Sequence, residues 1–237
     1  MPSQYFAIIP AAGSGSRFGA PLPKQYLTIN GLPIIRHAID ALLADARIAR
    51  VVVVLSPEDN DWHEGCLPTQ SQDRVSVIRI GGATRAESVL NGISWLVKNS
   101  NVESKDWILV HDAARPCLTP VQIDALITSL SDDPVGGLLA IPVADTVKRA
   151  DTAQRVEATV DRRSLWQAQT PQMFRLDLLQ RALGAIDLAV ATDESAAIEA
   201  LGYAPKLVAG SLANLKVTYP ADLSLATAII NSNAHNL

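Results

Sequence analysis

Residues 5–19 read Y-F-A-I-I-P-A-A-G-S-G-S-R-F-G, a short apolar run that passes directly into a glycine-rich loop. Further apolar runs follow at 51–55, 75–78, 107–110 and 138–141, and each ends close to glycine, proline or polar residues. Runs of this kind, rich in β-branched residues and without polar alternation, are typical of strands covered on both faces of a parallel sheet. We therefore expect all of these runs to be strands of one sheet.

Segments with helical periodicity separate the runs. Apolar residues within 34–43 and within 89–97 recur at spacings that place them on one face of a helix. Thr119-Pro120 predicts the start of another helix, which continues to Leu130, because a capping hydroxyl precedes a proline at the first helical position. The alternation predicts an α/β fold with a doubly wound, mostly parallel, Rossmann-like sheet, and ligands of such sheets bind beyond the carboxyl ends of the strands.

Residues 143–163 interrupt this alternation because they are polar and charged. Short strands at 146–148 and 156–158 are predicted around a polar turn. A two-stranded ribbon is marginally stable by itself, so we expect this one to pack against another surface, such as a second subunit. The prediction is a single domain over 1–237, with a protruding β-arm subdomain at 143–163 that serves dimerisation.

Composition excludes several classes of protein. With 237 residues, 48% of them hydrophobic and 19% charged, the chain is not disordered. Twenty Lys and Arg against 24 Asp and Glu argue against a surface for a nucleic acid polymer. We expect no membrane association and a cytoplasmic location, because the N-terminus lacks a signal-peptide pattern and no apolar run reaches the ~18 residues of a membrane span. Cys66 and Cys117 form no C-x-x-C pair, and His63 with Cys66 is too little for a metal site, so no protein-built metal site is expected.

The glycine-rich loop at 10–19 fits neither of two familiar phosphate-binding patterns. Three residues separate Gly15 from Gly19 where the dinucleotide pattern requires two, and the terminal Gly-Lys-Ser/Thr of the Walker loop is absent. What remains is a loop whose backbone N–H groups can cradle phosphate, with Arg17 and Lys24 close behind it. This combination suits a nucleoside triphosphate, and a tight turn with solvated basic residues is the alternative.

Ordered motifs along nearly the whole chain make the sequence similar to one known family, the 2-C-methyl-D-erythritol 4-phosphate cytidylyltransferases of the non-mevalonate isoprenoid pathway. The motifs are PAAGSGSRFG at 10–19, PKQYL at 23–27, GGATRAESVLNG at 81–92, VHDAARP at 110–116, PVADTVKR at 142–149, TVDRRSLW at 159–166, QTPQ at 169–172 and NLKVT at 214–218. The resemblance implies that CTP and methylerythritol phosphate are converted to 4-diphosphocytidyl-2-C-methyl-D-erythritol and pyrophosphate.

The resemblance also implies roles for individual residues. Arg17, Lys24 and Lys216 would stabilise the charge of the α-phosphoryl transition state. The nucleotide would be bound by Ala11, Ala12, Gly13, Gly15, Gly81, Gly82, Arg85 and Ser88, and the acceptor by Asp112, Thr146, Arg162 and Thr170. Mg²⁺ would be held mainly by the CTP phosphates, and arms exchanged between subunits would make a homodimer with composite sites.

Several of these residues also have plainer interpretations. Gly81-Gly82 would equally suit an ordinary turn, Ser88 a helix surface, Asp112 a turn cap and Arg162 a solvated surface cation. Arg115 could contact the nucleotide or pair with Asp112. The sequence also departs from the family pattern: Ala83 stands where an acidic residue is common, and Ser16 where a second arginine often sits.

Two other functions compete with methylerythritol phosphate cytidylyltransfer. One is a cytidylyltransferase for ribitol 5-phosphate or another polyol phosphate, with the same nucleotide end and a different acceptor end. The other is a nucleotide-binding module without turnover. The joint presence of Arg17, Lys24, Asp112 and Lys216 argues against the second.

Overall fold

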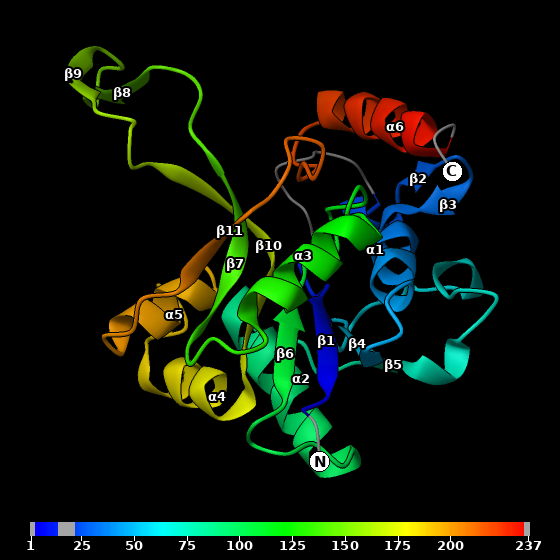
Figure 1. The fold of residues 1–237 in the computed structure, drawn as a ribbon. Helices are drawn as coiled ribbons and strands as arrows, with labels where there is room; N and C mark the ends of the chain where they lie inside the picture. Colours follow the sequence, from blue (N-terminus) through cyan, green and yellow to red (C-terminus); the bar gives the residue numbers. More distant parts are fainter. Residues whose placement is uncertain (1–2, 14–21, 235–237) are drawn as a thin grey trace.

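A seven-stranded sheet runs through the centre of the molecule (Figure 1). The computed structural model describes residues 3–13 and 22–234, and the strand order is β11-β7-β10-β6-β1-β4-β5. The strands are β1 (Tyr5–Pro10), β4 (Ile48–Val54), β5 (Val75–Ile78), β6 (Trp107–Val110), β7 (Gly136–Pro142), β10 (Trp166–Arg175) and β11 (Lys206–Ala209). All five strands expected from apolar runs are present, within a few residues of the expected bounds.

Strand β10 is the exception to the parallel arrangement. It lies antiparallel to both of its neighbours, with Met173 opposite Leu109 of β6 and Gln172 opposite Leu138 of β7. The other pairings of this sheet are parallel. A doubly wound, mostly parallel α/β fold is thus confirmed, with one reversed strand that the apolar pattern does not predict.

Helices cover both faces of the sheet. They are α1 (Ile34–Leu43), α2 (Arg85–Asn99), α3 (Pro120–Leu130), α4 (Leu176–Ala185) and α5 (Glu194–Ala200). Alternate residues of each strand face opposite layers, so Ile9 packs in the core with α1 and α3 while Ile8 packs in the core with α2, α4 and α5. Thr119 caps α3 in a reciprocal capping box with Gln122, as its position before Pro120 predicts.

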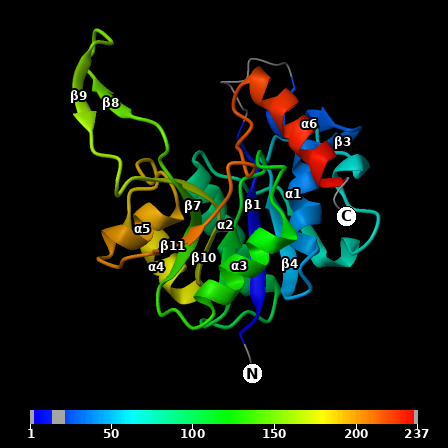
Figure 2. The same cartoon turned by 45° about the horizontal axis from the view of Figure 1, so that its top comes forward.

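The polar excursion forms a ribbon of β8 (Val147–Ala150) and β9 (Val156–Val160), which pair antiparallel. Both views show this ribbon projecting away from the body of the molecule (Figures 1 and 2). Its side chains are mostly exposed. The chain leaves the sheet from β7 and returns into β10, so the protruding arm stands on two neighbouring strands.

The last helix, α6 (Pro220–Ala234), packs against the small β2 (Thr28–Ile29) and β3 (Leu32–Pro33) hairpin region through a separate apolar cluster that includes Ile29 and Ala226. The segment just before it is fixed to the sheet because the Val217 N–H donates to the Ala114 carbonyl at 2.8 Å. This contact brings Lys216 to the end of β6. Among the described residues, no helix combines the length and apolarity required to cross a membrane.

Candidate active site

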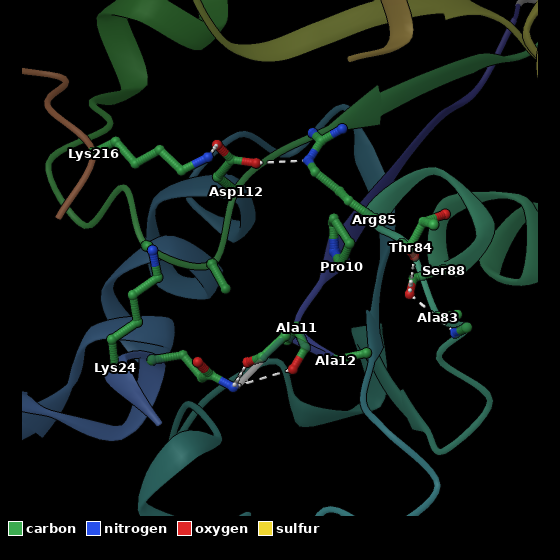
Figure 3. Close-up of a pocket in the computed structure, with 15 residues that line it drawn as sticks. Pro10, Ala11, Ala12, Lys24, Ala83, Thr84, Arg85, Ser88, Asp112 and Lys216 are labelled. Atoms are coloured by element: carbon green, nitrogen blue, oxygen red, sulfur yellow. Dashed lines mark hydrogen bonds and ion pairs between the residues drawn. The ribbon is translucent and has the colours of Figure 1, made fainter. Parts of the chain in front are cut away.

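A cavity of about 320 Å³ lies beyond the carboxyl ends of β1 and β6 (Figure 3). Segments from widely separated parts of the chain form its wall. The lining residues are Pro10, Ala11, Ala12, Gly13, Lys24, Gln25, Gly82, Ala83, Thr84, Arg85, Ser88, Asp112, Ala113, Ala114 and Lys216. This is the edge of the sheet at which the fold class predicts a ligand.

Asp112 is the electrostatic centre of the cavity wall. Its carboxylate lies between two cations, with Lys216 Nζ 2.8 Å from Oδ2 and Arg85 Nε 3.0 Å from Oδ1 (Figure 3). Arg115 Nε lies 3.6 Å from Oδ2. Burial alone would raise the pKa of Asp112, but these cations outweigh it and hold the pKa well below the ordinary value of 3.8. The carboxylate is therefore ionised throughout the physiological pH range.

A buried glutamine, Gln25, fixes the part of the glycine-rich loop at Ala11–Gly13. Gln25 Nε2 donates to the carbonyls of Ala11 at 3.1 Å and Gly13 at 3.3 Å. Lys24, beside it on the short helix η2 (Lys24–Tyr26), donates from Nζ to the Val217 carbonyl at 3.1 Å. Lys24 and Lys216 thus line one cavity, as expected from the sequence.

The loop before α2 forms the opposite wall. A Cβ at Gly81 would lie 2.3 Å from Ala12 Cβ and 2.7 Å from the Leu55 carbonyl oxygen, so only glycine allows the two loops to approach. Ser88, only 1% exposed, accepts a hydrogen bond from Gly82 N–H at 3.1 Å and donates to the Thr84 carbonyl at 3.0 Å. Ser88 is therefore not a helix-surface residue, since its hydroxyl shapes this loop.

Thr170 lies behind Asp112, in the interior. Its hydroxyl accepts a hydrogen bond from the Asp112 N–H at 3.1 Å and lies 3.0 Å from His111 Nδ1. His111 Nε2 lies 3.1 Å from the Arg115 carbonyl, which can only accept, so Nε2 carries the proton and Thr170 donates to Nδ1. Burial lowers the pKa of His111 to about 4, so the ring is neutral at pH 7.

Some expected site residues are not brought to the cavity. Thr146 and Arg162 are exposed at the arm and are not part of the wall of this chain's own cavity. Gly15 and Arg17, together with the departing position Ser16, lie outside the described residues. The question left open for Arg115 is answered in favour of pairing with Asp112, and Arg115 Nη1 also donates to the Asn214 carbonyl at 2.6 Å.

Two residues that contact the cavity wall do not stand out in the sequence. Gln25 belongs to the quoted PKQ motif, and its place directly after Lys24 is the signal that could have identified it. Glu194, which is fully buried, pairs with Arg85 across 109 residues of sequence. Its surroundings, T-D-E-S, are polar and carry no sign of burial.

The described residues 3–13 and 22–234 contain no group of three or more His, Cys, Asp or Glu side chains that could hold a metal ion. Asp112 is the one carboxylate among the described lining residues, and basic side chains engage both of its oxygens. The His63–Cys66 pair is a local contact, with Sγ 3.7 Å from Nδ1. A divalent ion here would need most of its oxygen ligands from a bound substrate.

Comparison with known proteins agrees with this architecture. The family model described as 2-C-methyl-D-erythritol 4-phosphate cytidylyltransferase matches residues 5–232. Proteins with that name from Dechloromonas aromatica and Nitrosospira multiformis are 55% and 52% identical to the chain. The alignments cover 98% of this chain and 99% of the first relative, and 96% of this chain and 98% of the second.

Solved structures give the same result. A crystal structure of a 4-diphosphocytidyl-2C-methyl-D-erythritol synthase is 40% identical and superposes with a TM-score of 0.84, covering 97% of this chain and 99% of the other. The 2-C-methyl-D-erythritol 4-phosphate cytidylyltransferase of Francisella tularensis is 31% identical with a TM-score of 0.80, covering 96% and 100%.

Proposed function

The chain belongs to the 2-C-methyl-D-erythritol 4-phosphate cytidylyltransferase family, and we propose that the cavity around Asp112 is the site of its reaction. The enzyme transfers the cytidylyl group of CTP to 2-C-methyl-D-erythritol 4-phosphate and releases pyrophosphate. The observation that carries the assignment of the site is the convergence of Lys24, Lys216 and the Ala11–Gly13 loop on one cavity.

Electrostatics is the main task of this site. A phosphate oxygen of the acceptor attacks the α-phosphorus of CTP, one O–P bond forms, and the bond to the β-phosphate oxygen breaks as pyrophosphate leaves. Both reactants are anions, so their repulsion and the charge on the α-phosphoryl oxygens must be offset. Lys24 and Lys216 supply fixed positive charge from opposite parts of the chain, and Arg17 would add a third.

The two loops would bind the nucleotide. Ala11, Ala12 and Gly13 present backbone groups to the triphosphate, and the loop containing Gly81 and Gly82 would present backbone groups to the cytosine edge. Ser88 would act there mainly by fixing the loop, because its hydroxyl is engaged by Gly82 and Thr84, and Arg85 would act by holding Asp112. Ala83 offers the base no polar side chain, so selection of cytosine falls to the backbone.

The acceptor would lie between Asp112 and an arm. Asp112 can accept hydrogen bonds from polyol hydroxyls, and Thr170 would act through Asp112, because its hydroxyl accepts from the Asp112 N–H on the interior side. Arg162 and Thr146 would bind the acceptor phosphate and its chain, with the Arg162 guanidinium able to grip two phosphate oxygens.

We further propose a homodimer with exchanged arms and one domain per chain. The support is that Arg162 and Thr146 are exposed, flank the ribbon of β8 and β9, and do not line their own chain's cavity. A partner's arm would then complete each site. Cys66 and Cys117 are buried free thiols, which suits a reducing compartment, and we place the enzyme in the cytoplasm.

Mg²⁺ is the proposed cofactor, bound mainly by the CTP phosphates. The residues present fit this mode, because Asp112 alone cannot form a carboxylate cage and already neutralises basic side chains. When bound, the ion would neutralise phosphate charge and favour the leaving pyrophosphate. Lys24 and Lys216 would orient the phosphoryl oxygens.

A pyrophosphate-release assay with CTP and Mg²⁺ tests the proposal, with methylerythritol phosphate and ribitol 5-phosphate compared as acceptors. We expect release with methylerythritol phosphate only. Release with ribitol phosphate in preference would overturn the acceptor, and no release with either would favour a module without turnover. Lys216→Ala and Asp112→Asn in the same assay test the site, since full activity of both variants would exclude this cavity.

A further inference from the structure

Glu194 is a buried carboxylate directly behind the cavity wall. It is 0% exposed, and its two oxygens accept hydrogen bonds from the two terminal nitrogens of Arg85, at 2.6 Å from Nη1 and 3.1 Å from Nη2. The remaining donor of the guanidinium, Nε, reaches Asp112 at 3.0 Å. Arg85 therefore bridges one carboxylate outside the cavity and one on its wall.

A buried charge of this kind has a large desolvation cost unless it is paired with good geometry. Arg85 and Glu194 form a bidentate pair, an arrangement that fixes the orientation of the guanidinium as well as its distance. With the terminal nitrogens directed at Glu194, Arg85 donates to Asp112 from Nε alone, at 3.0 Å. The Oδ2 oxygen of Asp112 is left for Lys216, 2.8 Å away, and the carboxylate stays between its two partners (Figure 3).

Glu194 is itself held in place from the sheet. It is the first residue of α5, whose N-cap Asp193 accepts a hydrogen bond from Gln172 Nε2 at 2.9 Å. Gln172 Oε1 accepts from the Ser195 N–H at 2.8 Å, so one buried glutamine of β10 grips both flanking residues. The helix terminus is fixed two residues along β10 from Thr170, which itself holds Asp112.

We propose that Glu194 is a positioning residue for cytidylyl transfer: by holding the terminal nitrogens of Arg85, it sets the orientation of Asp112 toward the acceptor. This inference rests on the proposed role of Asp112 in binding the polyol. Glu194 lines no part of the cavity and acts through Arg85 alone.

Glu194→Gln is the direct test because it keeps the size of the side chain and removes its charge. Without the Glu194 carboxylate, the terminal nitrogens of Arg85 can rotate toward Asp112 and compete with Lys216 for its carboxylate. We expect KM for methylerythritol phosphate to rise about tenfold, within the range of coupled polar networks, with KM for CTP changed by less than about twofold. Glu199→Gln is the matched control, since Glu199 lies one turn further along α5, is exposed, and bonds to Ser195 rather than Arg85.

A double-mutant cycle separates positioning from a general structural effect. In an Arg85→Gln background the route from Glu194 to Asp112 is already broken, so adding Glu194→Gln should change the acceptor KM by less than about twofold. Additive effects of the two substitutions would overturn the inference, as would a wild-type acceptor KM in the Glu194→Gln single variant. Thermal unfolding of each variant reports the stability cost separately, and the double variant removes both buried charges if the single variants fold poorly.

A crystal structure of the Glu194→Gln variant gives a readout that does not depend on turnover. We expect the Arg85 guanidinium to be rotated and the Lys216–Asp112 pair to be lengthened or broken. An unchanged guanidinium and an intact pair would overturn the inference. If the wild-type enzyme released no pyrophosphate, the proposed function would be wrong. The crystal structure of the variant would still show whether Glu194 positions Arg85 and Asp112.

Discussion

Replacement of Asp112 by asparagine should destabilise the folded protein strongly, although the two side chains have nearly the same size. The carboxylate is almost fully buried and faces Lys216, Arg85 and Arg115 at 2.8, 3.0 and 3.6 Å. Removing one member of such a buried network leaves the other charges uncompensated, which costs about 3–5 kcal/mol. In a chain of this length, each kcal/mol lowers Tm by about 2–4 °C, so the expected decrease is roughly 6–20 °C.

The dependence on pH gives a second check. The pKa of Asp112 is depressed in the folded state, so the stabilisation that this carboxylate contributes is complete above its ordinary value of 3.8. The contribution is lost as the pH falls through the lower, folded-state value. The difference in free energy of unfolding between wild type and Asp112→Asn should therefore be constant from pH 5 to 8 and should narrow below about pH 4.

Denaturant unfolding at several pH values measures this difference, with Asp40→Asn as the control. Asp40 pairs with Arg36 at 2.8 Å on the surface of α1, and its side chain is 40% exposed. An exposed pair of this kind contributes about 0–1 kcal/mol, so the control should unfold close to wild type. An Asp112→Asn variant no less stable than Asp40→Asn at pH 7 would refute the electrostatic account of the site.

Three further outcomes are expected. Lys24→Ala should lower kcat by about 100-fold, because that is the usual cost of losing one electrostatic donor, and it should change CTP affinity much less. An unchanged kcat in steady-state assays would show that Lys24 only binds CTP in the ground state. An equal mixture of Arg162→Ala and Lys24→Ala chains should regain roughly a quarter of wild-type activity. Half of the randomly mixed dimers are hybrids, and in each hybrid one of the two sites combines an intact Lys24 with an intact Arg162 from the other chain. No recovery after subunit exchange would exclude arms acting across the dimer. Burial keeps His111 neutral and lowers its pKa to about 4, so the free energy of unfolding should decrease by up to about 1.4 kcal/mol per pH unit as the pH falls from about 6.5 to 4. His111→Gln should remove this slope in denaturant titrations, and an identical slope in the variant would contradict a buried neutral imidazole.

The sheet was predictable where burial and sequence pattern coincide. Strands β1, β4 and β6 contribute apolar residues to the clusters on both faces of the sheet, and Arg50 of β4 is the one charged residue among them, so these strands stand out in the sequence. Strand β10 is equally central but carries polar residues. Gln169 and Gln172 are buried on it because their amides bond to the Ser211 carbonyl and to the start of α5. Hydrophobicity cannot reveal a strand whose polar groups are satisfied by distant parts of the chain.

The same reasoning separates the predictable and unpredictable parts of the site. Lys24 and Lys216 occur in quoted motifs, and their meeting in one cavity follows from the rule for the carboxyl ends of parallel strands. Glu194 occurs in no such motif and resembles a solvated helix terminus. Its burial depends on α5 being packed against β10, a relation that exists only in the folded molecule.

The reversed direction of β10 has an evolutionary consequence. The outgoing and returning ends of the arm meet as paired residues, Pro142 and Trp166, on adjacent strands. The chain between them can therefore become longer, shorter or different in sequence without breaking the hydrogen bonds between β7 and β10. Under the proposed role of the arm, its length and sequence can change the choice of acceptor without altering the residues that line the cavity.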